Sequence, residues 1–194
     1  MSVINKSTLL SWRNDSREIH KGVTASLNEW RSESRYGKVT IFLSHKHDEN
    51  EELDAAISLL KRFGVNIYVD WQDGGMPTKT SGETAKRIKS KVKECKKFIF
   101  LATEGAISSR WCNWELGFGD SQRFMDNLAI FPIKNDYQSG FSGSEYLNIY
   151  SAIEHLEGSK TVGGTEIPKG WYVMNPADEN GHRSFTPIRT WLMR

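Results

Sequence analysis

Short apolar runs alternate with amphipathic segments along most of the chain. Each run is rich in β-branched and aromatic residues and is short enough for a strand buried on both faces. The five runs are Val39–Leu43, Val65–Val69, Phe98–Leu101, Leu128–Ile133 and Trp171–Met174. Between most of them, apolar residues recur at helical spacing. Because strands that alternate with helices form parallel sheets covered on both faces, the pattern predicts an α/β fold, a flavodoxin-like doubly wound five-stranded parallel sheet.

Polar residues and glycines predict where the helices begin and end. Asp48, with Glu51 three residues later, has the pattern of a helix N-cap, and Gly64 supplies the stop of the same helix. Thr80 and Glu83 form a second capping pair. Three later segments are predicted as a helix at 145–156, a loop at 158–170 and a closing helix at 185–194.

The first 37 residues are less regular than the rest. Between positions 7 and about 35, apolar residues such as Trp12 and Trp30 lie among many polar ones, and Gly22 interrupts them. We interpret residues 1–37 as an N-terminal helical extension and residues 38–194 as the main domain. The two tryptophans either cover the domain's outer helices or form a contact between subunits.

Composition narrows the setting in which the protein acts. The 194 residues suffice for one domain, and 26 basic against 24 acidic residues leave a net charge of +2. No general affinity for polyanions or membrane surfaces follows from that charge. Cys95 and Cys112 are the only cysteines, which indicates a reducing compartment. Without a signal peptide or a membrane-length apolar run, the chain is expected to be cytoplasmic, with no membrane partner.

Polar side chains follow directly on the predicted strands. Ser44 and His45 come after the first strand, and Asp70 and Trp71 come after the second. The carboxyl ends of parallel strands share one edge of the sheet, where doubly wound proteins bind ligands. We therefore expect these four residues to bind the substrate. The following segment, 72–82, is rich in glycine and is predicted to be a mobile loop that closes over the site.

A helix is predicted to begin at the same edge. Ser108 or Ser109 can cap it, and the helix extends to about residue 125. Trp111 and Glu115 are four residues apart on it, so an aromatic ring and a carboxylate lie on one helix face. A glutamate in an early helical turn is usually a solvated residue. Its place at the sheet edge is what makes Glu115 a candidate for catalysis.

Several familiar chemistries lack their motifs. The absence of G-x-G-x-x-G, Walker and G-x-S-x-G patterns argues against nicotinamide-linked dehydrogenases, P-loop nucleotidases and serine hydrolases. His45 and His47 have weak spacing for a metal, with no matched carboxylate cluster, so no metal is expected. Cys112 lies near a helix start, which lowers a thiol pKa, but without a histidine partner it is interpreted as structural. Gly117 and Gly119 are expected to permit close helix packing.

The strongest charge run contains the lysines and the arginine between Lys86 and Lys97. No aromatic residue within the run offers a platform for stacking a base, and most such runs are solvated helix faces. Nucleic acid is therefore not expected as a partner.

Three motifs, taken together, resemble the TIR domain family. They are Phe42-Leu43-Ser44, Asp70-Trp71 before a glycine-proline loop, and the most specific, Ser109-Arg110-Trp111-Cys112-x-x-Glu115-Leu116. The resemblance covers about residues 38–194 and is strongest to stand-alone bacterial TIR proteins of Thoeris-type antiphage systems. It implies an enzyme that cleaves NAD to nicotinamide and either ADP-ribose or a cyclic isomer.

The resemblance also implies roles for particular residues. Glu115 stands at the position of the glutamate that the catalytic members require, and Trp111 at that of a tryptophan that positions the substrate. Loop 72–82 corresponds to a segment that lines the site and mediates self-assembly, so a homo-oligomer is expected. NAD would be a substrate, with no cofactor needed, and a further protein would sense the nucleotide product.

Two alternatives stay open. Many TIR proteins are scaffolds that act through TIR–TIR contacts without turnover, and the motif ending in Glu115 also occurs in some of these. A more distant alternative is an enzyme resembling nucleoside deoxyribosyltransferases, which share the sheet plan and a catalytic carboxylate but act on free nucleosides.

Overall fold

The structure is a computed structural model that describes most of the chain. The described residues are 3–13, 38–70, 81–123, 125–139, 141, 143–158, 160–162 and 165–194. Three predictions fall wholly or mainly outside them: the N-terminal helix beyond residue 13 with Gly22 and Trp30, the substrate-binding residue Trp71, and the loop at 72–82 up to residue 80.

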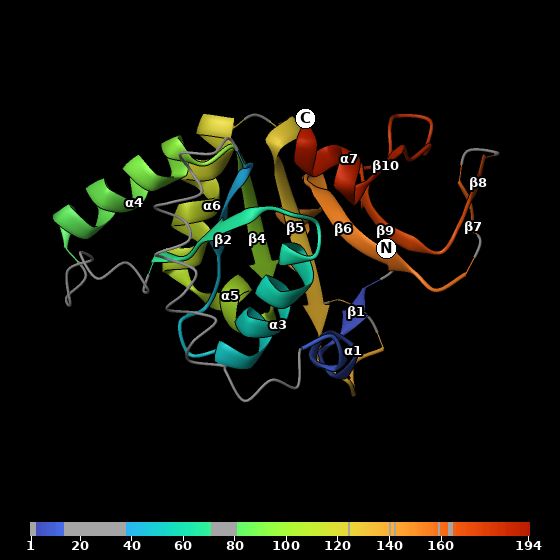
Figure 1. The fold of residues 1–194 in the computed structure, drawn as a ribbon, viewed down its shortest axis with the longest axis horizontal. Coiled ribbons are helices and arrows are strands. Elements are labelled where there is room, and N and C mark those ends of the chain that lie inside the picture. Colours follow the sequence, from blue (N-terminus) through green and yellow to red (C-terminus); the bar gives the residue numbers. More distant parts are fainter. Residues whose placement is uncertain are drawn as a thin grey trace.

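Five parallel strands form the centre of the molecule (Figure 1). In chain order they are β2 (Thr40–Ser44), β3 (Asn66–Tyr68), β4 (Lys97–Ala102), β5 (Leu128–Lys134) and β6 (Ser151–Leu156). In space they lie as β3, β2, β4, β5 and β6. Counted along the chain this is the order 2-1-3-4-5 of a flavodoxin-like doubly wound sheet, so the predicted fold class is confirmed.

Additional strands make the sheet mixed and larger than predicted. Antiparallel to β6 lies β9 (Gly170–Met174), and antiparallel to β9 lies β10 (Phe185–Pro187). Near the amino terminus, β1 (Ile4–Asn5) pairs in parallel with the end of β5. A separate hairpin, β7 (Lys160–Val162) and β8 (Thr165–Ile167), projects beyond β9 (Figure 1). The run at 171–174 is a strand, but it is not the fifth parallel one.

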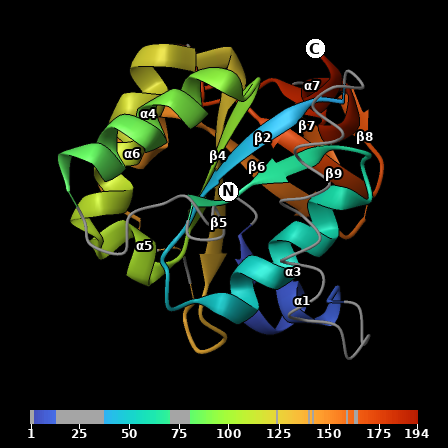
Figure 2. The same ribbon diagram turned by 60° about the vertical axis from the view of Figure 1, so that its left-hand side comes forward.

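Helices cover both faces of this sheet (Figure 2). One face carries α4 (Gly82–Glu94), α5 (Glu104–Ser108) and α6 (Arg110–Arg123). The other carries α1 (Lys6–Ser11), α3 (Asn50–Lys61) and α7 (Ile188–Met193). Two short 3-10 helices, at Met125–Asn127 and Glu145–Ile149, lie in the connections.

Each central strand contributes side chains to two hydrophobic cores, one on either face of the sheet. In β2, Ile41 and Leu43 point into the core under α3, whereas Phe42 points into the core under α4 and α6. Side chains alternate across a strand, so a continuous apolar run is what a strand covered on both faces requires. Ser44 continues this alternation and emerges on the α6 side at the end of β2.

Helix ends were predicted with mixed success. Gly64 does end its helix, and its φ of 76° is the left-handed backbone that favours glycine. The first N-cap was placed wrongly, because α3 starts after Glu49 rather than Asp48. The second capping box is one residue later than predicted, with Ser81 and Thr84 exchanging bonds of 3.3 and 3.2 Å.

The segment from 145 onward holds the main errors. The predicted helix at 145–156 is a 3-10 turn followed by β6, the predicted loop at 158–170 contains β7 and β8, and the predicted closing helix starts as β10. Glu154 sits at the centre of β6 and is fully buried, with its carboxylate 3.1 Å from the guanidinium of Arg183. Such a strand depends on its neighbours β5 and β9, which a local pattern does not reveal.

The described part of the N-terminal segment packs on the domain. The Trp12 ring lies edge-on to Trp171 and His155, with ring centroids 4.9 and 5.3 Å away. For Trp12, this supports packing on the domain, here against sheet strands rather than outer helices.

Candidate active site

Helix α6 begins at the sheet edge, as its sequence predicts. The Ser109 hydroxyl accepts a hydrogen bond of 3.3 Å from the backbone N–H of Cys112, which caps the first turn. A short helix that was not predicted, α5, stands between β4 and α6, and Thr103 caps it by accepting from Ala106 at 3.1 Å. Trp111 and Glu115 are four residues apart on α6 and therefore lie on one face of this helix.

Glu115 is buried beneath this face, with 2% of its surface exposed. The Ser44 hydroxyl donates a hydrogen bond of 2.6 Å to Glu115 Oε2, and the Trp111 side chain also hydrogen-bonds to the carboxyl group. Burial raises the pKa of Glu115 well above its usual range, and the charge of Asp70 adds to the rise. The bonds from Ser44 and Trp111 favour the ionised form and partly offset that rise.

Trp111 is half-buried and belongs to an aromatic row on α6. Its ring stacks on Trp114 at 4.9 Å between centroids, and Trp114 in turn stacks on Phe118. The row fixes the position of the Trp111 indole, which holds the Glu115 carboxyl group.

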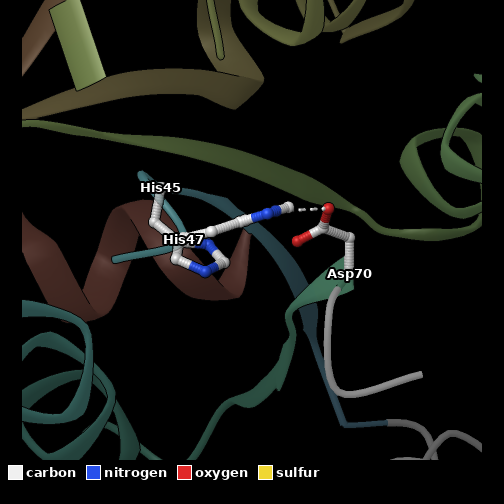
Figure 3. A group of neighbouring side chains, drawn as sticks. All are labelled: His45, His47 and Asp70. Atoms are coloured by element: carbon white, nitrogen blue, oxygen red, sulfur yellow. Dashed lines mark hydrogen bonds and ion pairs between the residues drawn. The ribbon is translucent and has the colours of Figure 1, made fainter. Parts of the chain in front are cut away.

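Two histidines and an aspartate, His45, His47 and Asp70, gather close to one another (Figure 3), and Asp70 is the member of this group whose charge acts on Glu115. His45 is 3% exposed, its Nδ1 lies 3.2 Å from the carbonyl oxygen of Leu43, and burial lowers its pKa to about 4. His47 Nε2 lies 3.0 Å from Asp70 Oδ2, and this bond raises the pKa of His47. The expectation that no carboxylate accompanies the two histidines is therefore wrong, because the fold brings Asp70 to them.

Cys112 is buried, and its thiol donates a hydrogen bond of 3.2 Å to the carbonyl oxygen of His45. Burial raises the pKa of this thiol to about 12, so the expectation of a pKa lowered by the helix start is wrong. Desolvation of the thiolate outweighs the helix end. Cys112 instead ties α6 to the segment after β2, as a structural residue does.

The two glycines of α6 differ from each other. A Cβ at Gly119 would lie 2.7 Å from the ring of Phe98, so the prediction of close packing is confirmed there. A Cβ at Gly117 would meet no atom within 4 Å, so the same prediction is wrong for that position.

The sheet brings together five of the six predicted site residues: Ser44, His45, Asp70, Trp111 and Glu115. They meet at the carboxyl ends of β2 and β3, where α6 begins. This place lies next to the point between β2 and β4 at which the winding direction of the sheet reverses. His47 is the neighbour for which the sequence predicted no role. Its spacing of two from His45, directly after a strand, was the signal available.

A second concave surface adjoins this edge on the β5 side. It has a volume of about 560 Å³, and its lining includes five acidic residues: Asp48, Glu49, Glu51, Glu52 and Glu104. Lys6 is the basic residue of this lining, and its Nζ lies 2.5 Å from Glu52 Oε1. This negative lining disfavours the diphosphate of a dinucleotide.

Comparison with known proteins identifies the family. A model of the TIR domain matches residues 41–158, about three-fifths of the chain. The chain belongs to the TIR domain family. The matched part of this TIR protein contains the five parallel strands, except for the first residue of β2, and every residue of the site described above.

This TIR protein is similar in sequence to two bacterial proteins. One, from Bacillus cereus (strain MSX-D12), is named "Probable 3' cyclic ADP-D-ribose synthase ThsB'" and is 33% identical over 161 residues, which cover 79% of this chain and 75% of the relative. The other, from Cytobacillus dafuensis, is named "Putative cyclic ADP-D-ribose synthase TIR2" and is 24% identical over 119 residues. That match covers 53% of this chain and 31% of the relative.

None of the helices in the described part of the chain has the length and hydrophobicity of a membrane-spanning segment.

Proposed function

We propose that this TIR protein cleaves NAD at the bond between nicotinamide and ribose and forms a cyclic ADP-ribose isomer. The observation that carries the proposal is the buried carboxyl group of Glu115, held by Ser44 and Trp111 at the sheet edge. The names of both relatives, which contain the words "cyclic ADP-D-ribose synthase", support a cyclic product. The resemblance to Thoeris-type proteins supports a role in antiphage signalling, in which another protein senses the product.

The charge of the substrate suits the charge of this site. Glu115 in a buried site beside Asp70 resists ionisation. The nicotinamide ring of NAD is a pyridinium cation, and a cation brought next to Glu115 favours the carboxylate. Substrate binding would thus ionise the group that the reaction needs.

One carboxylate is sufficient for this chemistry. When the glycosidic bond breaks, its electron pair leaves with nicotinamide and neutralises the pyridinium, so no acid has to protonate the leaving group. Ordinary glycosidases need a second carboxyl group, because the oxygen of their leaving group must be protonated. The positive charge that develops on the ribose then lies beside Glu115, whose carboxylate stabilises it.

The acceptor decides the product. Attack by water at the reacting carbon gives ADP-ribose, whereas attack by a hydroxyl or ring nitrogen of the same dinucleotide gives a cyclic isomer. Water or a hydroxyl releases a proton when it attacks, whereas a ring nitrogen without a hydrogen attacks through its lone pair and takes on the positive charge. Cyclisation requires the site to exclude water and to fold the substrate back. Trp111, with its ring fixed by Trp114, is the aromatic side chain beside Glu115 that can stack on a base.

The test is incubation of concentrated protein with NAD, followed by chromatography of the products. Wild type should release nicotinamide, and Glu115→Gln should not. Glu104→Gln, which changes an exposed glutamate on α5, is the matched control and should behave as wild type. ADP-ribose as the sole co-product would contradict the cyclase assignment.

The same experiment addresses the alternatives. No nicotinamide release, even when the protein is clustered on a scaffold to imitate TIR–TIR assembly, would favour a non-catalytic scaffold. Turnover of free nucleosides but not of NAD would favour the deoxyribosyltransferase-like enzyme. Sedimentation of the protein with and without NAD tests the proposed homo-oligomer.

A further inference from the structure

Three potential metal ligands converge at the candidate active site, and two of them, His45 and Asp70, belong to it. His45 and His47 follow β2, Asp70 follows β3, and Figure 3 shows the three side chains gathered together. One ligand atom from each, a nitrogen of each histidine and a carboxylate oxygen of Asp70, lie within 4.8 Å of one another. Two imidazoles and one carboxylate are a donor set typical of transition-metal sites.

His45 already has the arrangement of a metal ligand. Its Nδ1 faces the carbonyl oxygen of Leu43 at 3.2 Å, which favours the tautomer with the proton on Nδ1. Nε2 is then a lone-pair donor, and it is buried with no hydrogen-bond partner among the described residues. Buried polar atoms nearly always have a partner. A histidine held by a carbonyl through one nitrogen, with the other nitrogen open, is the usual setting of metal-binding imidazoles.

His47 and Asp70 supply the other two ligands and an entry route. Their Nε2 and Oδ2 atoms are 3.0 Å apart, a separation that two ligands of one metal ion can have at bond lengths of about 2.0–2.2 Å. The His47 side chain is 55% exposed whereas that of Asp70 is 6% exposed. The exposed imidazole can therefore turn toward His45 and admit an ion from solvent.

We propose that His45, His47 and Asp70 bind a divalent transition-metal ion such as Zn²⁺. Magnesium and calcium prefer oxygen ligands, so two imidazoles select against them. Three protein ligands leave at least one coordination position open, as in catalytic rather than structural zinc sites. Two of these ligands belong to the proposed NAD site, but metal binding is measured directly and does not depend on NAD turnover.

The probe is Co²⁺, whose visible absorption reports nitrogen and oxygen ligands in a tetrahedral site. The experiment uses full-length protein without a histidine tag. Wild type should bind one equivalent of Co²⁺, which Zn²⁺ displaces, and His47→Gln should weaken binding about tenfold or more. His182→Gln is the matched control, because His182 is an exposed histidine 3.7 Å from an aspartate and, among the described residues, belongs to no group of three potential metal ligands. That variant should bind as wild type does.

Two results would overturn the proposal. One is the absence of a Co²⁺ spectrum in wild type, which would leave the open nitrogen of His45 as a contact for substrate. The other is equal binding by wild type and His47→Gln, which would place the ion elsewhere. If His47→Gln fails to fold, nitrogen NMR of wild type decides: Zn²⁺ should shift the ring signals of His45 and His47, and shifts confined to other histidines refute the site.

Discussion

The hydrogen bond from Ser44 to Glu115 makes a quantitative prediction. Ser44→Ala removes an O–H donor that lies 2.6 Å from Glu115 Oε2. A hydrogen bond to an ionised group contributes about 1.5–3 kcal/mol. This bond favours the carboxylate, so its loss raises the pKa of Glu115, by about one to two units at 1.36 kcal/mol per unit. Ser44 is itself buried, so the cavity left by alanine stays dry and small.

The assay is the pH dependence of kcat/KM for NAD cleavage. If Glu115 must be ionised, activity falls at acid pH with the pKa of Glu115 in the free enzyme. Ser44→Ala should move that acid limb upward by about one to two units, with a loss of about 10–100-fold at pH values below the limb. Activity well above the limb should recover substantially.

Ser109→Ala is the matched control for this prediction. It removes a serine hydroxyl from the cap of the same helix but not from Glu115, so it should lower the melting temperature without moving the acid limb. An unchanged limb in Ser44→Ala, in protein that remains folded and active, would refute the assigned role of the hydrogen bond.

Three further predictions concern stability. The pKa of Glu115 is raised in the folded chain, so the contribution of Glu115 to stability falls as pH rises from the ordinary glutamate value of about 4.3 toward the raised pKa. The melting temperature of Glu115→Gln should therefore exceed that of wild type by a margin that grows with pH. A margin that stays constant would contradict this prediction. The pKa of His47 is raised in the folded chain, so its stabilising interaction with Asp70 is complete below about pH 6.5 and is lost as pH rises through the raised pKa. The melting temperature of wild type should therefore exceed that of His47→Gln by a margin that shrinks with increasing pH. A margin that persists at high pH would be evidence against the ion pair. Gly119→Ala should cost about 1–3 kcal/mol in denaturant unfolding, because its Cβ meets a phenylalanine ring at 2.7 Å, whereas Gly117→Ala should stabilise α6 by up to about 1 kcal/mol; equal effects would refute the packing argument.

The central sheet was predictable because its strands are buried on both faces. Apolar runs such as Val39–Leu43 and Leu128–Ile133 need no partner to be recognised, and β2 and β5 lie where these runs predict them. Gly64 was equally readable, since its positive φ is a local property. By contrast, β6 with its buried Glu154 exists because β5, β9 and Arg183 surround it, and no local pattern encodes those neighbours.

The features of the candidate site likewise divide into those that the local sequence predicts and those that depend on the fold. Spacing along one helix is local, so the sequence placed Trp111 and Glu115 on a common face, and the ends of predicted strands pointed to Ser44, His45 and Asp70. Burial and pairing are not local. Only the folded sheet puts Ser44 against Glu115, sets Asp70 beside both Glu115 and the two histidines, and buries Cys112 deeply enough to raise the pKa of its thiol.

For this TIR protein, hydrophobic periodicity and sequence motifs were sufficient to predict the doubly wound fold and the catalytic candidate, because both depend on residues that are close together in the sequence. The protonation of Glu115, the open nitrogen of His45 and the meeting of two histidines with an aspartate were decided by the tertiary structure. Each of these depends on desolvation and on distances between strands and helices that are far apart in the chain.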